Sequence, residues 1–365
     1  MRLRGVSYDV GRVLDGMNWR PAFDPAETHR ELEIIRDDLH CNAVRICGED
    51  VGRVMTVAAD ALALGMDVWL SPELRDHDRP ETLDYIATAA RQAERLHEQW
   101  PGRVTLSVGS ELTLFMKGFL AGDTFRERLA HPALFDQLRS GAHDEPLNAF
   151  LARVTDAVRQ VFGGEISCAS LTAEHVDWSR FDVVGVDLYR EAANKGYYTR
   201  DLRRYLSYGR PLVIAEFGCC TFRSAADMGP NGWQIVDFST LPPRLNGDYI
   251  RDEGEQAREV ADLLATFAEA GVYGTFVFAF VQPLNPYSED PRYDLDMAAY
   301  SLVKSFGSRL GDVASLLPEV PWDTTRMGTA YPGMPWEPKQ SFRAVADAYR
   351  PCLPAVLTGR RPGTS

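Results

Sequence analysis

Residues 43–70 read AVRICGEDVGRVMTVAADALALGMDVWL, and this stretch contains one complete unit of the fold. Its first part, residues 43–47, is an apolar run with the length of a buried β-strand. Residues 51–64 carry apolar side chains at helical spacing, and residues 67–70 form a second apolar run. A strand, a helix and a second strand in this order are typical of a parallel sheet whose strands are joined by helices.

The same alternation continues along the chain and predicts eight strands. Several of the apolar runs are rich in valine and isoleucine, as in strands buried on both faces. The clearest helix is predicted for residues 25–39, where Asp24 is a candidate N-cap and Pro25 takes the first helical position. The predicted strands are residues 3–8, 43–47, 67–70, 104–108, 165–170, 183–188, 212–217 and 275–281, and the predicted helices are 25–39, 51–64, 80–99, 146–161, 253–270 and 338–349.

Eight such units predict an α/β fold of the (β/α)₈ TIM-barrel type, whose active site lies at the carboxyl ends of the strands. The alternative is a doubly wound open sheet, but no G-x-G-x-x-G or P-loop sequence follows an early strand, which disfavours its nucleotide-binding forms. Long connections follow strands four, seven and eight, at residues 112–145, 218–251 and 282–337, and such loops often carry function. Their aromatic side chains either line a pocket or only anchor the loops; they are Phe115, Phe119, Trp233, Tyr249, Tyr287, Tyr293, Trp322 and Trp336.

The length of 365 residues allows two domains, but a single barrel with insertions also reaches this size. Hydrophobic residues make up 45% and charged residues 25% of the chain, as in ordinary globular proteins. We expect one barrel domain over residues 1–350. Residues 351–365 contain several prolines, two adjacent arginines and a Gly-Thr-Ser end, which predicts a flexible C-terminal tail.

Charge and cysteine content restrict the partners and the compartment. The net charge of −13 disfavours binding to nucleic acid through its phosphates. No uncharged run reaches the roughly 18 residues that span a bilayer, and the N-terminal sequence lacks the apolar segment and cleavage site of a secretory signal. The 6 cysteines form no C-x-x-C pair and are more typical of reduced thiols than of a disulfide framework. We therefore expect a cytoplasmic protein that binds neither nucleic acid nor membrane.

Two glutamates stand where predicted strands end. Glu111 follows strand four in the sequence Ser107-Val-Gly-Ser-Glu111-Leu, and Glu216 ends strand seven in Val213-Ile-Ala-Glu216-Phe. A carboxylate at the end of a buried strand loses hydration unless it is hydrogen-bonded or faces a cleft, so each position calls for a chemical explanation. Their occurrence on strands four and seven of eight makes them candidate catalytic residues.

At these positions the sequence resembles clan A of the glycoside hydrolases, over roughly residues 3–282. Gly109-Ser-Glu111-Leu is similar to the Asn-Glu-Leu of that clan, and Ile214-Ala-Glu216-Phe-Gly218 is similar to its strand-seven motif. Arg45 on strand two resembles the arginine that supports the nucleophile, and Tyr189 after strand six resembles the tyrosine that contacts it. Read from the residues alone, Arg45 equally fits a buried ion pair and Tyr189 a core ring.

The resemblance implies a retaining glycoside hydrolase or transglycosidase that acts on an oligosaccharide or a small glycoside. Glu216 is the implied nucleophile, and Glu111 is the implied acid/base, which requires a raised pKa. Arg45 and Tyr189 are expected to keep Glu216 ionised. No cofactor and no metal ion are expected.

The sequence also departs from the pattern of the clan. Ser110 stands where the clan has an asparagine that contacts the sugar, and strand eight lacks the usual tryptophan, whose place Phe280 or Gln282 is expected to take. Glu73, at the end of strand three, and Trp233, in the loop after strand seven, are further candidate substrate-binding residues. Weaker candidates are Asp9, Arg75, His77, Glu174, His175, Asn231 and Asn285.

Three other functions remain open from the sequence. One is a catalytically silent carbohydrate-binding barrel, because a fold and a motif do not establish turnover. The second is a metal-dependent hydrolase or isomerase, although neither H-x-H nor H-E-x-x-H occurs. The third is a thiol mechanism at Cys219 and Cys220, for which no adjacent histidine is evident. The metal ligands would come from Glu73, Glu111, Glu174, His77 and His175.

Overall fold

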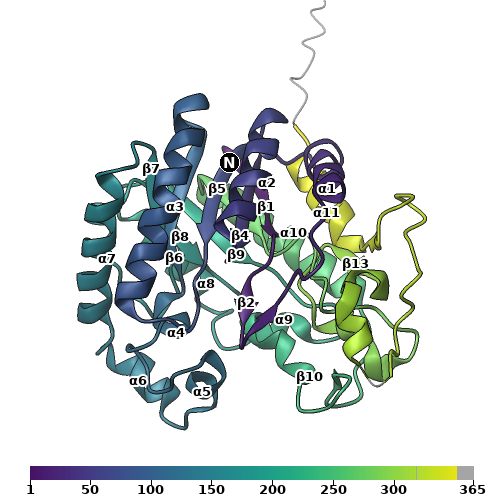
Figure 1. Ribbon diagram of the computed structural model, residues 1–365. Helices are drawn as coiled ribbons and strands as arrows, with labels where there is room; N and C mark the ends of the chain where they lie inside the picture. The colour runs from purple at the N-terminus through teal and green to yellow at the C-terminus, as the bar shows by residue number, and fades with distance from the viewer. Residues whose placement is uncertain (318, 352–365) are drawn as a thin grey trace, which may run out of the picture.

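The computed structural model describes residues 1–317 and 319–351, and its centre is a parallel sheet of eight strands (Figure 1). The strand order is β7-β6-β5-β4-β1-β12-β9-β8, and every neighbouring pair is parallel. The strands are β1 (Leu3–Asp9), β4 (Ala43–Gly48), β5 (Asp67–Pro72), β6 (Val104–Ser110), β7 (Glu165–Ala169), β8 (Val184–Asp187), β9 (Leu212–Phe217) and β12 (Gly274–Val277).

The two edge strands, β7 and β8, meet and close the sheet. The backbone N–H of Ser170 donates to Gly185 O over 3.1 Å, and the N–H of Asp187 donates to Ser170 O over 2.9 Å. Ser170 and Val186 thereby form a parallel bridge between the two edges. The predicted (β/α)₈ barrel is confirmed, and each of the eight predicted strands coincides with an observed one.

Helices surround the barrel and cover the outer face of the sheet (Figure 1). The six predicted helices are confirmed within a few residues, and Asp24 caps the first of them by accepting from the Ala26 N–H. Helix α8 was not predicted, and neither were the shorter helices of the loops; α8 has nine residues and only three buried side chains. The helices are α1 (Pro25–Asp37), α2 (Val51–Ala63), α3 (Arg79–Gln99), α7 (Asp144–Arg159), α8 (Tyr198–Leu206), α10 (Glu253–Ala270) and α11 (Gln340–Tyr349).

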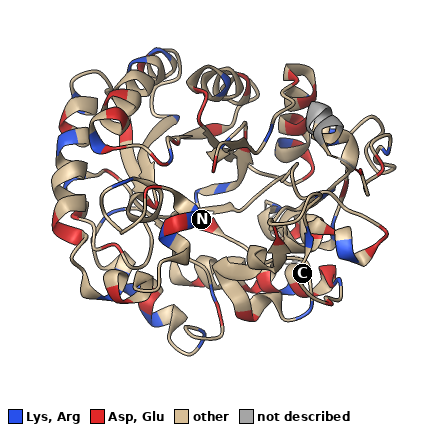
Figure 2. Ribbon diagram, turned by 60° about the horizontal axis from the view of Figure 1, so that its bottom comes forward, with Lys and Arg blue, Asp and Glu red and all other residues tan. Residues whose placement is uncertain are grey.

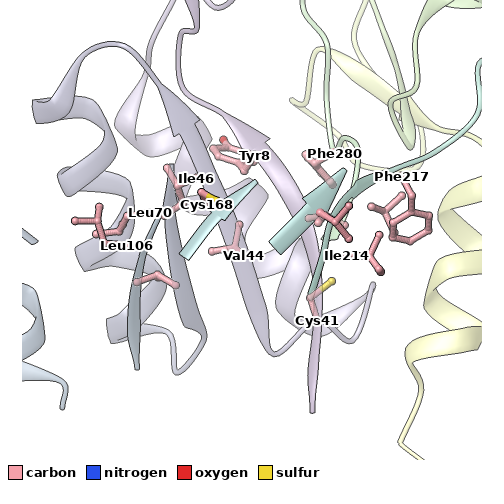
Figure 3. Close-up of a cluster of buried hydrophobic side chains, with 14 of the residues drawn as sticks. Tyr8, Cys41, Val44, Ile46, Leu70, Leu106, Cys168, Ile214, Phe217 and Phe280 are labelled. Atoms are coloured by element: carbon pink, nitrogen blue, oxygen red, sulfur yellow. The ribbon is translucent and has the colours of Figure 1, made fainter. Parts of the chain in front are cut away.

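The core lies mainly between the strands and the helices, and Figure 3 shows part of it. On β4, Val44 and Ile46 belong to this outer layer, whereas Ala43 belongs to a small cluster that includes Trp69 and Phe276. Successive strand residues point to opposite faces of a sheet. Arg45 therefore points into the barrel, together with Ala43.

Loop structures gather at the end of the barrel where the strands finish, the lower end in Figure 1. The connection 112–145 folds into α4 (Leu112–Phe115), α5 (Phe125–Ala130) and α6 (Leu134–Ser140). The connection 218–251 contains α9 (Ala225–Met228) and a two-stranded ribbon. A hairpin of β2 (Val13–Leu14) and β3 (Met17–Asn18) follows β1 and was not predicted. The third connection, 282–337, holds short 3₁₀ turns and β13 (Val303–Ser305), which pairs with β14 (Trp336–Pro338).

Acidic and basic residues are interspersed along the helices that face the viewer in Figure 2. Among residues 1–317 and 319–351, no helix has the length and apolar character to cross a membrane. The tail predicted for residues 351–365 lies outside the described residues except for Pro351.

Candidate active site

A pocket of about 430 Å³ opens at the carboxyl ends of the strands, and both candidate glutamates line it. Its lining falls into two parts. We call the residues at or near strand ends the floor and the residues on the surrounding loops the mouth. The floor consists of Arg12, Arg75, Glu111, Tyr189, Glu216, Phe278, Gln282 and Tyr300, and the mouth consists of Leu14, Asp15, Met17, Trp19, Phe115, Phe125, Arg126, Leu129, Ala130, Pro230, Trp233, Gln234 and Phe238.

Glu111 directly follows β6 and has a left-handed backbone, with φ of 47°. Its N–H donates to Ala169 O of the neighbouring strand over 2.8 Å. Burial and then the negative charges of Glu216 and Glu174 raise the pKa of Glu111 to about 8, although Arg75 and Arg45 oppose the shift. Glu111 is therefore mainly protonated at neutral pH, as a general acid must be.

Glu216, at the end of β9, is held at both carboxylate oxygens. Arg45 Nη1 donates to Oε1 over 2.5 Å, and the Tyr189 hydroxyl donates to Oε2 over 3.4 Å. Arg12 Nη1 lies 3.8 Å from Oε1 on the side of the pocket. The predicted partners, Arg45 and Tyr189, are thus in contact with this carboxylate, which is fixed in place beside the pocket.

Arg45 also connects two predicted substrate-binding residues. Its Nη2 donates to Ser110 Oγ over 3.1 Å and to Glu73 Oε1 over 3.4 Å. Neither Ser110 nor Glu73 lines the pocket, and both are buried. Burial opposes ionisation of Glu73, but the charges of Arg75, Arg12 and Arg45 outweigh it and lower its pKa to about 2. These two side chains therefore position the arginines and are placed behind the surface that a ligand would meet.

Arg12 and Arg75 were missed or underrated from the sequence. Arg12 is buried, and its Nε donates to Asp9 Oδ2 over 2.7 Å, while its guanidinium lies 4.8 Å from the centre of the Phe278 ring. Arg75 Nη2 donates to Glu73 Oε2 over 2.7 Å. Each arginine has an acidic partner close in sequence: Asp9 and Arg12 are three residues apart, and Glu73 and Arg75 are two residues apart.

Of the two residues predicted for the floor at strand eight, Gln282 lies there and Phe280 does not. Phe280 does not line the pocket; it is fully buried and packs against Trp336 and Tyr8. Phe278 takes a place on the floor instead. The physical reason is that β12 ends at Val277, four residues before the predicted end of the strand, so the following residues leave the sheet. Gln282 lines the pocket as predicted, and its Oε1 accepts from the Tyr300 N–H over 2.6 Å.

Two of the eight predicted loop aromatics, Phe115 and Trp233, line the pocket. Others serve as anchors: Trp336 is fully buried, and Trp322 Nε1 donates to Tyr293 O over 2.7 Å. Both roles, pocket lining and loop anchor, were open for this group of residues. The structure divides them between the two: Phe115 and Trp233 come from the loops after β6 and β9, and none of the four predicted aromatics in the connection 282–337 lines the pocket.

The residues proposed as metal ligands are not brought together. Glu174 is buried and accepts from the Thr113 and Leu171 N–H groups over 2.7 and 2.9 Å. The half-buried His77 pairs with Glu81, and the exposed His175 pairs with Asp144. Within residues 1–317 and 319–351, no group of three His, Cys, Asp or Glu side chains is arranged to hold a metal ion.

The two adjacent cysteines lie away from this pocket lining and are buried. Burial raises the pKa of both the Cys219 and the Cys220 thiols. The reactive form of cysteine is the thiolate, so these environments favour the unreactive form. Of the remaining candidates, Asn285 is buried and donates to Leu295 O, and Asn231 binds the side chain of Gln234.

No protein-family profile and no curated protein matches the sequence. Solved structures do share its fold. A GH113 beta-1,4-mannanase aligns over 96% of this chain and 99% of its own, with 13% identity and a TM-score of 0.58. The GH113 beta-mannanase of Alicyclobacillus acidocaldarius aligns over 95% and 97%, with 15% identity and a TM-score of 0.56. The beta-glucuronidase of Parabacteroides merdae aligns over 96% of this chain and 37% of its own, with 13% identity and a TM-score of 0.54. These neighbours are clan A TIM-barrel glycoside hydrolases, so the resemblance seen in the sequence is confirmed at the level of the fold.

Proposed function

We propose that the protein is a retaining glycoside hydrolase or transglycosidase, with Glu111 as acid/base and Glu216 as nucleophile. One observation carries the proposal: two carboxyl groups line the same pocket, one of them with a raised pKa and the other hydrogen-bonded to a buried arginine. Burial favours the protonated form of Glu111, whereas Arg45 forms a hydrogen-bonded ion pair with Glu216. Such a division of roles between two carboxyl groups is the requirement of glycoside hydrolysis.

In the first step, the Glu216 carboxylate attacks the anomeric carbon while the glycosidic bond breaks and the Glu111 proton moves to the leaving oxygen. The product is a glycosyl ester of Glu216. The charge of Glu216 is one cause of the raised pKa of Glu111, so ester formation lowers that pKa. Glu111 can then take a proton from water, or from an acceptor hydroxyl in transfer, whose oxygen attacks the anomeric carbon and releases Glu216.

Arg12 is the best placed residue to bind the hydroxyl groups of the sugar. Neither of its terminal nitrogens makes a hydrogen bond to any residue that the structure describes, and the side chain lines the floor next to Glu216. Ser110 does not line the pocket, and its Oγ accepts from Arg45, so it is not placed to replace the asparagine contact of the clan. We assign that contact to Arg12, with Tyr189 and Gln282 also facing the sugar.

The test is the stereochemistry of the first sugar released. A panel of 4-nitrophenyl glycosides in both anomeric configurations identifies a substrate, and proton NMR during its hydrolysis records which anomer forms before mutarotation. We expect the anomer with the configuration of the substrate, because a double displacement at Glu216 retains it. The opposite anomer indicates direct attack by water and removes Glu216 as nucleophile. Sugar binding without turnover of any glycoside supports a silent carbohydrate-binding barrel instead.

The pH dependence of kcat/KM tests the acid. The pKa of Glu111 is raised to about 8, so the protonated form predominates below that pH and activity falls above it. Arg75 opposes the raised pKa, so Arg75→Met is expected to move the basic limb of the profile to higher pH. Arg139→Met, which changes an exposed arginine of α6 outside the pocket, is the matched control. A basic limb that stays in place in Arg75→Met counts against Glu111 as the titrating acid.

A further inference from the structure

The mouth of the pocket differs chemically from its floor. Apart from Phe115 and Phe125, six of its side chains are apolar: five are hydrocarbons, and the sixth is the thioether of Met17, whose sulfur is only a weak hydrogen-bond acceptor. Two of them are well exposed for large apolar residues, with 50% of Met17 and 37% of Phe238 accessible to solvent. They come from the β2–β3 hairpin, from α5 and from the loop after β9, and they are Leu14, Met17, Leu129, Ala130, Pro230 and Phe238.

Three aromatic residues of the mouth, Phe115, Phe125 and Trp233, form a row that begins next to Arg75 of the floor. The Arg75 guanidinium lies 3.8 Å from the centre of the Phe115 ring, and Phe115 stacks on Phe125 with ring centres 4.8 Å apart. Phe125 in turn lies 6.4 Å from Trp233 across the pocket lining. These rings are mostly apolar, and the aliphatic residues of the mouth extend the apolar lining around them.

Polar side chains are a minority in the mouth, and two of them, Arg126 and Asp15, are paired with each other. Arg126 Nε donates to Asp15 Oδ2 over 3.2 Å, which joins α5 to the β2–β3 hairpin. Gln234 Nε2 donates to Asn231 Oδ1 over 2.9 Å. A second sugar at this place would bring several hydroxyl groups that need partners, and a buried hydroxyl without a partner is costly.

We propose that the mouth binds an aromatic aglycone, so that the substrate is an aryl glycoside and its sugar occupies the floor. This inference deepens the proposed function and rests on it for the place of the sugar. An aryl group gains from burial against Phe125, Trp233 and Phe238, since the gain grows with the apolar area removed from water. The volume of about 430 Å³ is within the range of pockets for small molecules.

Direct binding of the free aglycone tests the mouth independently of catalysis. The probe is 4-methylumbelliferone, and the signal is quenching of tryptophan fluorescence, to which Trp19 and Trp233 of the mouth contribute. We expect saturable binding that weakens about tenfold in the double variant Met17→Ser, Phe238→Ser. Phe135→Ser is the matched control, because Phe135 is 74% exposed on α6 and does not line the pocket. Equal affinity in the wild type and the double variant overturns the proposal.

Kinetics separate a failure of this inference from a failure of the proposed function. With the sugar identified by the nitrophenyl panel, the 2-naphthyl glycoside is compared with the disaccharide of that sugar. Phe238→Ser is expected to raise KM for the naphthyl glycoside about tenfold. The increase in KM for the disaccharide should be smaller. Turnover with equal losses for both substrates overturns the aryl-glycoside inference alone. Umbelliferone binding that the double variant weakens, without hydrolysis of any glycoside, overturns the proposed catalysis and leaves the aromatic site in place.

Discussion

Glu216→Gln is expected to lower kcat by about 10⁴- to 10⁶-fold, because an amide cannot attack the anomeric carbon as a carboxylate does. Glutamine has the same shape, and its side-chain oxygen can still accept the hydrogen bond from Arg45 Nη1. Arg45 also keeps its contact with Glu73. The variant should therefore fold and bind substrate. The measurement is kcat for the best nitrophenyl glycoside, together with the melting temperature of the variant.

Glu98→Gln is the control for a general effect of removing a carboxylate, since Glu98 is exposed on α3 and lies outside the pocket lining. It should leave kcat unchanged. Turnover of Glu216→Gln within about tenfold of the wild type would rule out Glu216 as the nucleophile. A large loss of kcat together with a strongly lowered melting temperature would be attributed to misfolding. In that case Glu216→Asp, which keeps the charge but moves it back by one methylene, tests whether the position of the carboxylate matters for kcat.

The barrel could be predicted from the sequence because its strands are buried on both faces. Each appears as an apolar run between segments of helical periodicity, and a charged residue in such a run is conspicuous. Arg45, Glu111 and Glu216 were found in this way, and the structure places all three around one site. Alternation along β4 requires Arg45 to point into the barrel, opposite Val44 and Ile46.

The rest of the site depends on loops, whose course the local pattern does not specify. Arg12 follows the first strand by three residues, but its approach to Glu216 requires the closed barrel and the hairpin after β1. Glu73 was predicted to face the substrate because it ends a strand. Instead, its carboxylate contacts Arg45 and Arg75. The sequence alone does not show which of several charged side chains a carboxylate will bind.

Glu111→Ala is expected to slow hydrolysis by about 10²- to 10⁴-fold for glycosides with poor leaving groups and much less for dinitrophenyl glycosides. The leaving oxygen of an ordinary glycoside needs the Glu111 proton, whereas a dinitrophenolate leaves without one. The measurement is kcat/KM for a series of aryl glycosides whose phenols have graded pKa values. We expect kcat/KM to depend more steeply on the pKa of the phenol in Glu111→Ala than in the wild type. Equal losses across the series would count against Glu111 as the acid.

Azide distinguishes the second role of Glu111 from the first. With a good leaving group, Glu111→Ala still forms the glycosyl ester of Glu216, but no base remains to activate water. Azide needs no base, and the space left by the side chain opens to the pocket. It should attack the anomeric carbon, release the Glu216 carboxylate and yield a glycosyl azide of retained configuration, with faster turnover. The same addition should not rescue Glu216→Gln, because that variant forms no ester for azide to attack.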